Sequence, residues 1–381
     1  MTSNEPSDHA YQFLNVEGEG VYELPVGPIH AGIIEPGHFR FSCYGEVIVN
    51  LEIRLGYVHR GVEKKLSEVP WRKARFVVEA AASDMAVANA LAHCVAIESL
   101  LEIELPRRPQ LLRTAAMEVE RLAMHLSDLG GLAGDIGFLA ISSSMARLRG
   151  LALRMGDLLA GNRFMRGYIC PGGTTRHFPD SNIKELTSTA KELSAQVNPV
   201  VEFFTENQVA IDRMQGVGKV SSKLATDFGL VGIAGRACGI DYDCRKFWSH
   251  ATFPKDHFIA TTDDAGDVLA RAKVRVGEIQ SSLQILLDII EEISSTPSPS
   301  SVPVPETLPA NCTAVGLVES HRGELIHLIF TNSLGQIQRY CIKDPSVNNW
   351  TGLAIAVRNN LIADFPLCNK SFSLSYSGHD L

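Results

Sequence analysis

The chain has 381 residues, of which 45% are hydrophobic and 20% charged, and its formal net charge is −8. This composition is ordinary for a soluble globular protein, and the length allows a sizeable core. The acidic balance excludes the basic footprint of a nucleic-acid-binding protein, so no nucleic-acid partner is expected. The most apolar stretch, residues 80–101, is interrupted by Asp84, His93 and Glu98, which favours a buried helix over a membrane-spanning one.

The first half of the chain is typical of a short β region followed by helices. After a polar tail at residues 1–20, apolar residues alternating with polar ones between 21 and 55 predict a hairpin with a turn at Tyr44-Gly45. Helical sequence follows Pro70, and the stretch 74–101 is rich in alanine. Further helices are expected at 109–129, ended by Gly130-Gly131, at 141–159, ended by Gly161, and at 183–213.

The second half returns to strands. Residues 216–239 are glycine-rich and irregular, residues 265–293 predict a long helix, and the Ser- and Pro-rich residues 294–309 predict an exposed linker. Strands are expected at 314–317 and 325–330 around a turn at Arg322-Gly323, then at 336–342, before a final helix at 350–362. This order predicts an α+β fold over residues 21–381, in which a central helical bundle is flanked by N- and C-terminal β regions.

Cysteine usage and the N-terminal sequence bear on the compartment. The eight cysteines are scattered, and no two have C-x-x-C spacing, so buried free thiols in a reducing compartment are expected. Cys238 and Cys244 lie six residues apart without a second pair, which favours core packing over metal binding. The first residues lack the basic and apolar regions of a signal peptide, and a cytoplasmic location is expected. No phosphate-binding glycine motif follows a predicted strand, so no sequence motif indicates direct nucleotide binding.

Several ionisable residues are candidates for a polar cavity. His59, Arg60 and Glu63 lie at a turn into a helix, where His59 and Glu63 could relay protons. The alternative is a structural ion-pair cluster with Lys64 and Lys65.

Two further candidates come from the helices and one from a turn. Arg121 and His125 are four residues apart and share a helix face, so they either face a cavity or form interhelical hydrogen bonds. Arg322 lies in the predicted turn between two strands. A buried arginine must be paired, and Asp364 is one candidate partner.

A set of short motifs, each weak alone, occurs in one order along the chain. It resembles the large subunit of membrane-bound energy-converting NiFe hydrogenases and the related D-type subunit of respiratory complex I, from about Gly27 to the C-terminus. The motifs are Gly27-Pro28-Ile29-His30, Pro36-Gly37-His38-Phe39-Arg40, Tyr57-Val58-His59-Arg60-Gly61-Val62-Glu63-Lys64, Glu120-Arg121-Leu122 with His125, Gly216-Val217-Gly218, Arg236 through Arg245-Lys246, Arg322-Gly323-Glu324 and Leu361-Ile362-Ala363-Asp364.

The resemblance implies a place in the peripheral arm of a membrane-bound complex. It implies a small iron–sulfur subunit and a membrane-embedded subunit as partners, with the iron–sulfur clusters held by neighbours. A separate complex I C-type subunit is expected, because the chain shows no counterpart of the N-terminal domain fused in some hydrogenase relatives. The chain would lie on the cytoplasmic side, peripheral to the inner membrane.

The chain departs from the hydrogenase pattern at the metal site. The resemblance implies four thiolates, in two C-x-x-C motifs, around nickel and iron, and soft thiolates suit such metals. The corresponding positions are Ala82, Met85, Ser375 and Gly378. Alanine and glycine cannot ligate, and serine and methionine are poor substitutes for thiolates, so no metal is expected in this chain.

The complex I relatives imply a different use of the vacated cavity, which there receives a quinone headgroup. A histidine on the N-terminal hairpin corresponds to His38, with His30 as a weaker choice, and the tyrosine that faces the quinone corresponds to Ser83. Because serine is shorter and a weaker acid, Asp84 is the alternative proton donor, unless it is only a carboxylate stabilised by a helix start. Arg322 corresponds to an arginine near the metal site.

Three hypotheses follow. The leading one is a large subunit of a complex I-like or energy-converting hydrogenase-like redox complex that lacks the NiFe site and forms a quinone-type cavity. The alternative is a non-catalytic scaffold that couples an iron–sulfur subunit to the membrane arm, with the cavity filled by Met85 and its neighbours. A third, a true hydrogenase, requires nickel. Whether the chain has a catalytic activity of its own is left open.

Overall fold

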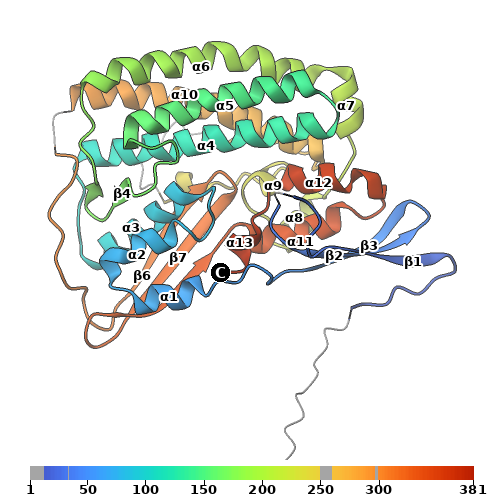
Figure 1. Ribbon diagram of the computed structural model, residues 1–381, viewed down its shortest axis with the longest axis horizontal. Helices are drawn as coiled ribbons and strands as arrows, with labels where there is room; N and C mark the ends of the chain where they lie inside the picture. The colour runs from blue at the N-terminus through green and yellow to red at the C-terminus, as the bar shows by residue number, and fades with distance from the viewer. Residues whose placement is uncertain (1–12, 33, 249–259, 297–298) are drawn as a thin grey trace, which may run out of the picture.

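A computed structural model describes residues 13–32, 34–248, 260–296 and 299–381. Figure 1 shows a layer of long helices lying across a second layer, which contains a C-terminal sheet, shorter helices and an N-terminal sheet. The expected α+β class, with a helical bundle flanked by two β regions, is confirmed. Within the described residues, no helix combines the length and the hydropathy that crossing a bilayer requires.

The helical layer is built from four long helices. They are α4 (Arg107–Asp135), α5 (Leu139–Ala160), α6 (Ser181–Glu206) and α10 (Val268–Ser295), with the short α7 (Gln208–Met214) after α6. Gly161 ends α5 in a left-handed conformation, as expected. The expected helix 183–213 is wrong as one piece, because the Asn207 side chain accepts a hydrogen bond from the Val209 amide and starts a new helix there.

The glycine pair in α4 does not end the helix, contrary to the prediction. Gly130 and Gly131 lie inside α4, which continues to Asp135. A Cβ on Gly130 would stand 3.1 Å from the Met145 Cβ of α5. The small residues therefore let two helices approach closely, and they are not a stop signal in this setting.

The predicted helical stretch 74–101 is interrupted. It forms α2 (Trp71–Val78) and α3 (Ala86–Leu100), preceded by α1 (Val62–Glu68), and residues 79–85 make an irregular loop between α2 and α3. Arg60 donates hydrogen bonds to the carbonyls of Ala80 (2.7 Å) and Ala81 (2.8 Å). These contacts satisfy carbonyls that a continuous helix would have used, so the loop is held by side chains from outside it.

The C-terminal sheet packs directly on α3. Its strands are β6 (Thr313–Ser320), β7 (Gly323–Thr331) and β8 (Ile337–Lys343), antiparallel in the order β6-β7-β8. The turn between β6 and β7 lies at His321-Arg322, one residue before the expected Arg322-Gly323. A Cβ on Gly316 would overlap the Ala92 carbonyl oxygen. The alanines of α3, all of them buried, therefore allow the backbones of the sheet and the helix to come into contact.

The N-terminal sheet carries the expected hairpin. Strands β1 (Val21–Val26), β2 (His38–Tyr44) and β3 (Val47–Arg54) pair antiparallel, and the β2–β3 turn lies at Gly45. One face of this sheet packs on the C-terminal helices α11 (Ser346–Ala356), α12 (Phe365–Phe372) and α13 (Tyr376–His379). Helix α11 corresponds to the helix expected at 350–362, but it begins and ends earlier. The remaining short elements are β4 (Ile169–Cys170), β5 (Gly173–Thr174), α8 (Ser222–Asp227), α9 (Gly232–Arg236) and the 3-10 turns η1 (Cys244–Lys246) and η2 (Ile362–Asp364).

As expected, most described residues of the Ser- and Pro-rich segment 294–309 are exposed or half-buried, but contacts also fix the segment to the rest of the protein. In its described part, Ser301 forms a β-bridge with Gly173, and Leu308 is buried. Trp71 and Arg72 of α2 donate hydrogen bonds to carbonyls of residues 304–306. The segment is thus held against the surface between α10 and the C-terminal sheet.

A buried network of charges joins the helical layer to the C-terminal sheet. Glu278 of α10 accepts hydrogen bonds from Arg236 (2.6 Å), Arg121 (3.3 Å) and His125 (2.9 Å). Arg236 also pairs with Glu319 of β6 at 2.7 Å. Burial alone would raise the pKa of Glu278, but Arg236 and its other partners hold this pKa well below its usual range.

This network predicts a large stability effect. Glu278→Ala should lower the free energy of unfolding by about 3–5 kcal/mol, because it leaves the Arg121 and Arg236 guanidinium groups buried without their shared carboxylate. The measurement is the midpoint of urea denaturation of the full chain. The matched control is Glu185→Ala, which removes an exposed partner of Arg154 and should leave the midpoint nearly unchanged. Equal midpoints for the two variants would contradict a structural role for the network.

Candidate functional site

The loop between α2 and α3 meets the C-terminal segment at Arg322. The Arg322 guanidinium, on the β6–β7 turn, binds Asp84 through both terminal nitrogens, with Nη1 to Oδ1 at 2.9 Å, and donates its Nε–H to the Ser373 carbonyl. The predicted partner Asp364 is wrong, since Asp364 lies 3.6 Å from Arg213. One buried arginine therefore joins segments that lie far apart in the sequence.

The four positions that correspond to hydrogenase thiolates are all used for packing or capping. Ala82 and Met85 are fully buried on the loop before α3. Ser375 caps α13, because its hydroxyl accepts the Gly378 amide at 2.9 Å. A Cβ on Gly378 would overlap the buried Asp344 carboxylate.

These residues do not fit a nickel–iron centre. None of the four positions supplies a thiolate, and within the described residues no three His, Cys, Asp or Glu side chains are grouped so as to hold a metal ion. The described cysteines lie elsewhere, most of them buried. Cys238 packs in the main apolar core, as predicted.

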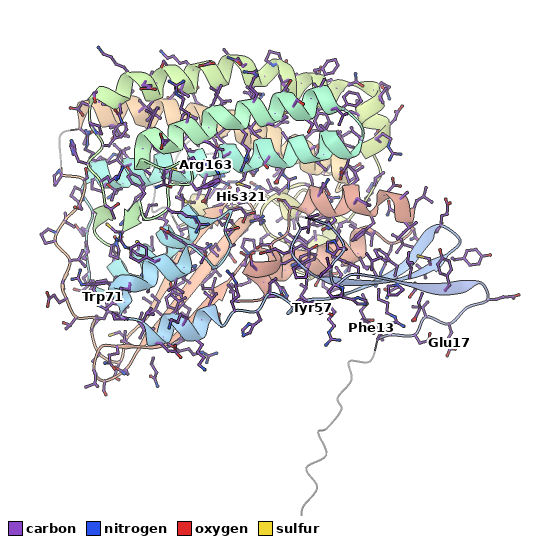
Figure 2. The ribbon with its side chains drawn as sticks, viewed as in Figure 1. Phe13, Glu17, Tyr57, Trp71, Arg163 and His321 are labelled. Atoms are coloured by element: carbon purple, nitrogen blue, oxygen red, sulfur yellow. The ribbon has the colours of Figure 1, made fainter. Side chains whose placement is uncertain are left out.

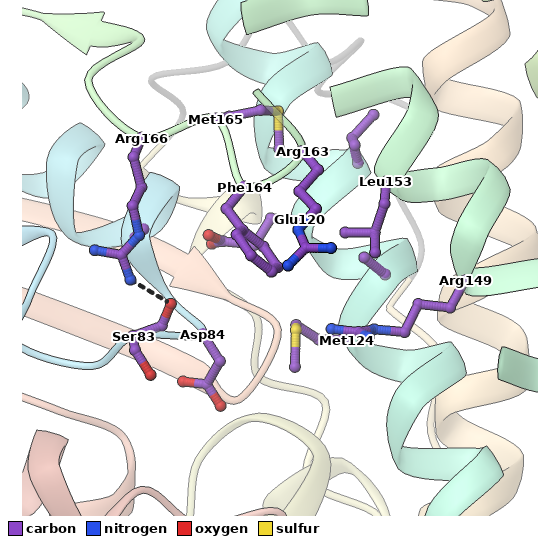
Figure 3. A pocket seen from close by; sticks show the side chains of 13 residues that line it. Ser83, Asp84, Glu120, Met124, Arg149, Leu153, Arg163, Phe164, Met165 and Arg166 are labelled. Atoms are coloured by element: carbon purple, nitrogen blue, oxygen red, sulfur yellow. Dashed lines mark hydrogen bonds between the residues drawn. The ribbon is translucent and has the colours of Figure 1, made fainter. Parts of the chain in front are cut away.

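A cavity of about 340 Å³ opens beside this loop (Figure 3). It lies between the start of α3, helices α4 and α5, and the loop after α5. Ser83 and Asp84 line one side of it, and the Asp84 side chain is 32% exposed. The rest of the wall combines apolar and charged side chains. It is made by Ala86, Val119, Glu120, Ala123, Met124, Arg149, Leu153, Arg163, Phe164, Met165 and Arg166.

The cavity has two carboxyl groups whose pKa values are shifted in opposite directions. Burial would raise the pKa of Asp84, but the Arg322 guanidinium more than offsets this and holds the pKa well below its usual range. Glu120 of α4 is 8% exposed and accepts hydrogen bonds from the amides of Val87 (2.8 Å) and Ala88 (3.1 Å) at the start of α3. Burial nevertheless raises the pKa of Glu120 to about 8. Near neutral pH, Asp84 is therefore ionised and Glu120 is mostly protonated.

Arginines supply positive charge to the same cavity. Figure 3 shows the guanidinium groups of Arg149, from α5, and Arg163, from the loop after α5, turned toward the space beside Glu120. Neither forms an ion pair with a carboxylate in the described part of the chain, although Arg163 stacks over the Phe164 ring at 4.7 Å. Arg166 donates a hydrogen bond to the Ser83 carbonyl at 3.1 Å. The cavity is consequently suited to a ligand that carries or gains negative charge.

Two of the predicted candidates, His59 and Glu63, line a different hollow. An open groove of about 1000 Å³ runs along β3, α11 and the C-terminus and includes both residues. The His59 ring contacts the Asp380 carbonyl (2.8 Å), and Glu63 accepts the Ile342 amide (2.8 Å). Lys65 pairs with Glu68, so the expected ion-pair cluster with Lys64 and Lys65 does not form. Arg60, the third candidate of this motif, holds the loop before Ala82.

The hairpin histidines are also separated from the 340 Å³ cavity. His38 begins β2, and its ring lies 5.3 Å from that of Phe13, which Figure 2 shows beside the N-terminal sheet. His30 instead faces the C-terminal helix, where its Nε2 lies 3.2 Å from the Tyr376 hydroxyl. Neither histidine is among the residues that line the cavity.

Arg121 and His125 belong to the buried charge network and do not line the cavity. Of the two alternatives for these residues, the one in which they form hydrogen bonds between helices therefore describes their contacts. The His125 ring packs edge-on against His321 at 6.3 Å, and His321 lies beside Arg322 in the junction between the two layers (Figure 2). Burial lowers the pKa of both histidines, to well below its usual range for His321, so both are neutral near pH 7.

The sequence did not single out four of the residues that define the cavity: Glu120, Arg149, Arg163 and Arg166. Glu120 appeared only within the Glu120-Arg121-Leu122 motif, and the several other charged residues of the same helix gave no local signal that would distinguish it. The arginines come from α5 and the loop after it, and their convergence depends on how these elements pack.

Comparison with known proteins agrees with this architecture. Residues 135–307 match the family model described as the respiratory-chain NADH dehydrogenase 49 kDa subunit. A D-type subunit of the NADH-quinone oxidoreductase of Solibacter usitatus is 30% identical over 341 residues, which cover 90% of this chain and 92% of that protein. The carbon monoxide-induced hydrogenase of Rhodospirillum rubrum is 29% identical, covering 92% and 96%.

Other relatives are longer than this chain. Formate hydrogenlyase subunit 5 of Escherichia coli is 28% identical across 97% of the chain, which spans only 65% of that protein's length. Among solved structures, a chain of the membrane-bound sulfane sulfur reductase, an archaeal respiratory membrane complex, superposes with a TM-score of 0.88 at 25% identity, covering 95% of this chain and 99% of that one. The chain therefore belongs to the family of large subunits formed by the D-type (49 kDa) subunits of NADH-quinone oxidoreductases and the related hydrogenase subunits.

Proposed function

We propose that this chain is the large subunit of a membrane-bound respiratory complex, that it holds no nickel–iron centre, and that its 340 Å³ cavity receives a quinone-type electron acceptor. The observation that carries the proposal is this cavity beside the loop that has lost its ligand positions. Its volume lies near the lower end of the roughly 300–1,000 Å³ typical of small-molecule sites. Its mixed wall offers apolar surface to a ring and polar groups to carbonyl oxygens.

The charges on the wall support an acceptor that is reduced in place. When a quinone gains electrons, negative charge develops on its oxygens. Arg149 and Arg163 face the cavity without carboxylate partners in the described residues. Such preorganised positive groups stabilise charge that appears only during the reaction.

The names of several relatives describe subunits of larger complexes, one of which is a respiratory membrane complex, and this context supports the three partners that we propose. A small iron–sulfur subunit would supply electrons, a membrane-embedded subunit would anchor the complex, and a complex I C-type subunit would complete the peripheral arm. The chain would lie on the cytoplasmic side, peripheral to the inner membrane. Any NADH chemistry would belong to another subunit, because no nucleotide-binding motif is present in the sequence.

The alternative function, a scaffold without redox chemistry, has one observation in its favour. The space that four thiolates would surround is occupied, since Met85 is fully buried and Asp344 packs against Gly378. A scaffold requires no ligand in the neighbouring cavity. A substitution that fills this cavity therefore distinguishes the two functions, because it should impair only the redox function.

The first test fills the cavity from α4. Ala123→Phe should lower quinone-dependent activity of the purified complex at least about tenfold, because the ring takes up space that the acceptor needs, while subunit assembly is retained. The matched control is Ala146→Phe on α5, where the alanine is exposed. Unchanged quinone reduction in Ala123→Phe would favour the scaffold.

The second test concerns metal content. The purified complex should contain no stoichiometric nickel by inductively coupled plasma mass spectrometry, because the four ligand positions offer no thiolate. Iron from partner subunits serves as the internal standard. One nickel per chain would instead support a hydrogenase.

A further inference from the structure

We propose that Glu120 is the proton donor to the reduced acceptor in the cavity, in place of the tyrosine that Ser83 replaces and of Asp84, which the sequence suggested. This inference rests on the proposed function, since it assigns a residue to the reaction in that cavity. It is carried by the position of the Glu120 carboxyl on the cavity wall.

Asp84 is unsuited to the role although it lines the same cavity. Both of its oxygens bind Arg322, and this guanidinium keeps the carboxyl ionised. A carboxylate without a proton can accept one but cannot donate one. Ser83 has only an alcohol, which is a far weaker acid than a phenol.

Glu120 is held in place by α3. Its two oxygens accept the amides of Val87 and Ala88, so the side chain points toward the start of that helix, and its rotation is restricted. This geometry fixes the side chain of a residue that lines the cavity together with Phe164, Met124 and Asp84 (Figure 3). A positioned acid of this kind, with a pKa near the working pH, is an efficient general acid.

The polar and charged groups around Glu120 come from α3, from its own helix α4, from α5 and the loop after it, and from the β6–β7 turn. The amides of α3 and the Arg121 charge on its own helix lower its pKa, whereas burial and the Asp84 carboxylate raise it. The other charged groups that line or adjoin the cavity are Arg149 of α5, Arg163 and Arg166 of the loop after α5, and Arg322 of the β6–β7 turn.

Conversion of a quinone to a quinol takes two electrons and two protons. The electrons come one at a time from an iron–sulfur cluster of the partner subunit, which is oxidised. The Glu120 O–H bond breaks as an O–H bond forms on one quinone oxygen, and water at the mouth of the cavity supplies the proton for the other oxygen. Solvent then returns a proton to the Glu120 carboxylate.

The test uses the purified complex. Its iron–sulfur clusters are reduced with dithionite, excess reductant is removed, and a soluble short-chain ubiquinone is mixed in by stopped flow. Reoxidation is followed from about pH 6 to 9, which brackets the pKa of Glu120. The wild-type rate should fall as the pH rises through about 8, because the protonated carboxyl is present below its pKa and lost above it.

Glu120→Gln should slow reoxidation by roughly two orders of magnitude at neutral pH and remove this pH dependence. Quinone affinity should be retained. Glu206→Gln, which changes an exposed carboxyl of α6 outside the cavity, should leave both the rate and the pH profile as in the wild type. An unchanged rate and profile in Glu120→Gln, with wild-type reoxidation intact, would overturn the role of Glu120 and leave the proposed function standing.

A second variant keeps the test decisive if Glu120→Gln does not assemble. Glu120→Asp keeps a carboxyl at this position and shortens the side chain by one methylene, so it should slow reoxidation while the rate still falls with rising pH. Reoxidation with both the wild-type rate and the wild-type inflection would contradict the assignment. Absence of any quinone-dependent reoxidation in the wild type would instead refute the proposed function itself.

Discussion

The contact between Arg322 and Asp84 is the constraint on which the rest of the site depends. It joins the loop before α3 to the β6–β7 turn, and the same guanidinium holds the backbone of Ser373 in the C-terminal segment. The guanidinium is buried and binds both carboxylate oxygens of Asp84, so this ion pair holds the two segments adjacent.

The elements that carry this contact are held in place by close packing elsewhere in the molecule. Gly316 lets β6 touch the backbone of α3, and Gly130 lets α4 touch α5. The buried network around Glu278 then ties α4 and α10 to the sheet. A charge pair in a dry environment is stronger than one in water, but it also requires that every partner be present.

The structure was predictable from sequence where local pattern decides it, and unpredictable where distant contacts decide it. The hairpin turn at Gly45 and the helix stop at Gly161 follow from local chemistry. The conformation of the loop at residues 79–85 does not follow from local chemistry. Its alanine-rich sequence suits a helix, and contacts from other elements hold it in a non-helical conformation. In the site, a motif marks Arg322, and the correspondence at Ser83 points to the neighbouring Asp84, but the arginines of the cavity come from a helix and a loop whose packing no motif encodes.

The two carboxyl groups of the cavity differ in protonation state near neutral pH, because their immediate surroundings differ. Asp84 faces a guanidinium and stays ionised, so its charge is fixed and serves to hold the loop. Glu120 faces amides and apolar side chains, and burial keeps its proton available near neutral pH. The negative charge of Asp84 also raises the pKa of Glu120, so the residue that fixes the loop helps its neighbour to keep a proton. The ionised Asp84, the protonated Glu120 and the nearby arginines give this cavity the means for proton transfer and charge stabilisation, which the proposed reduction of a quinone-type acceptor requires.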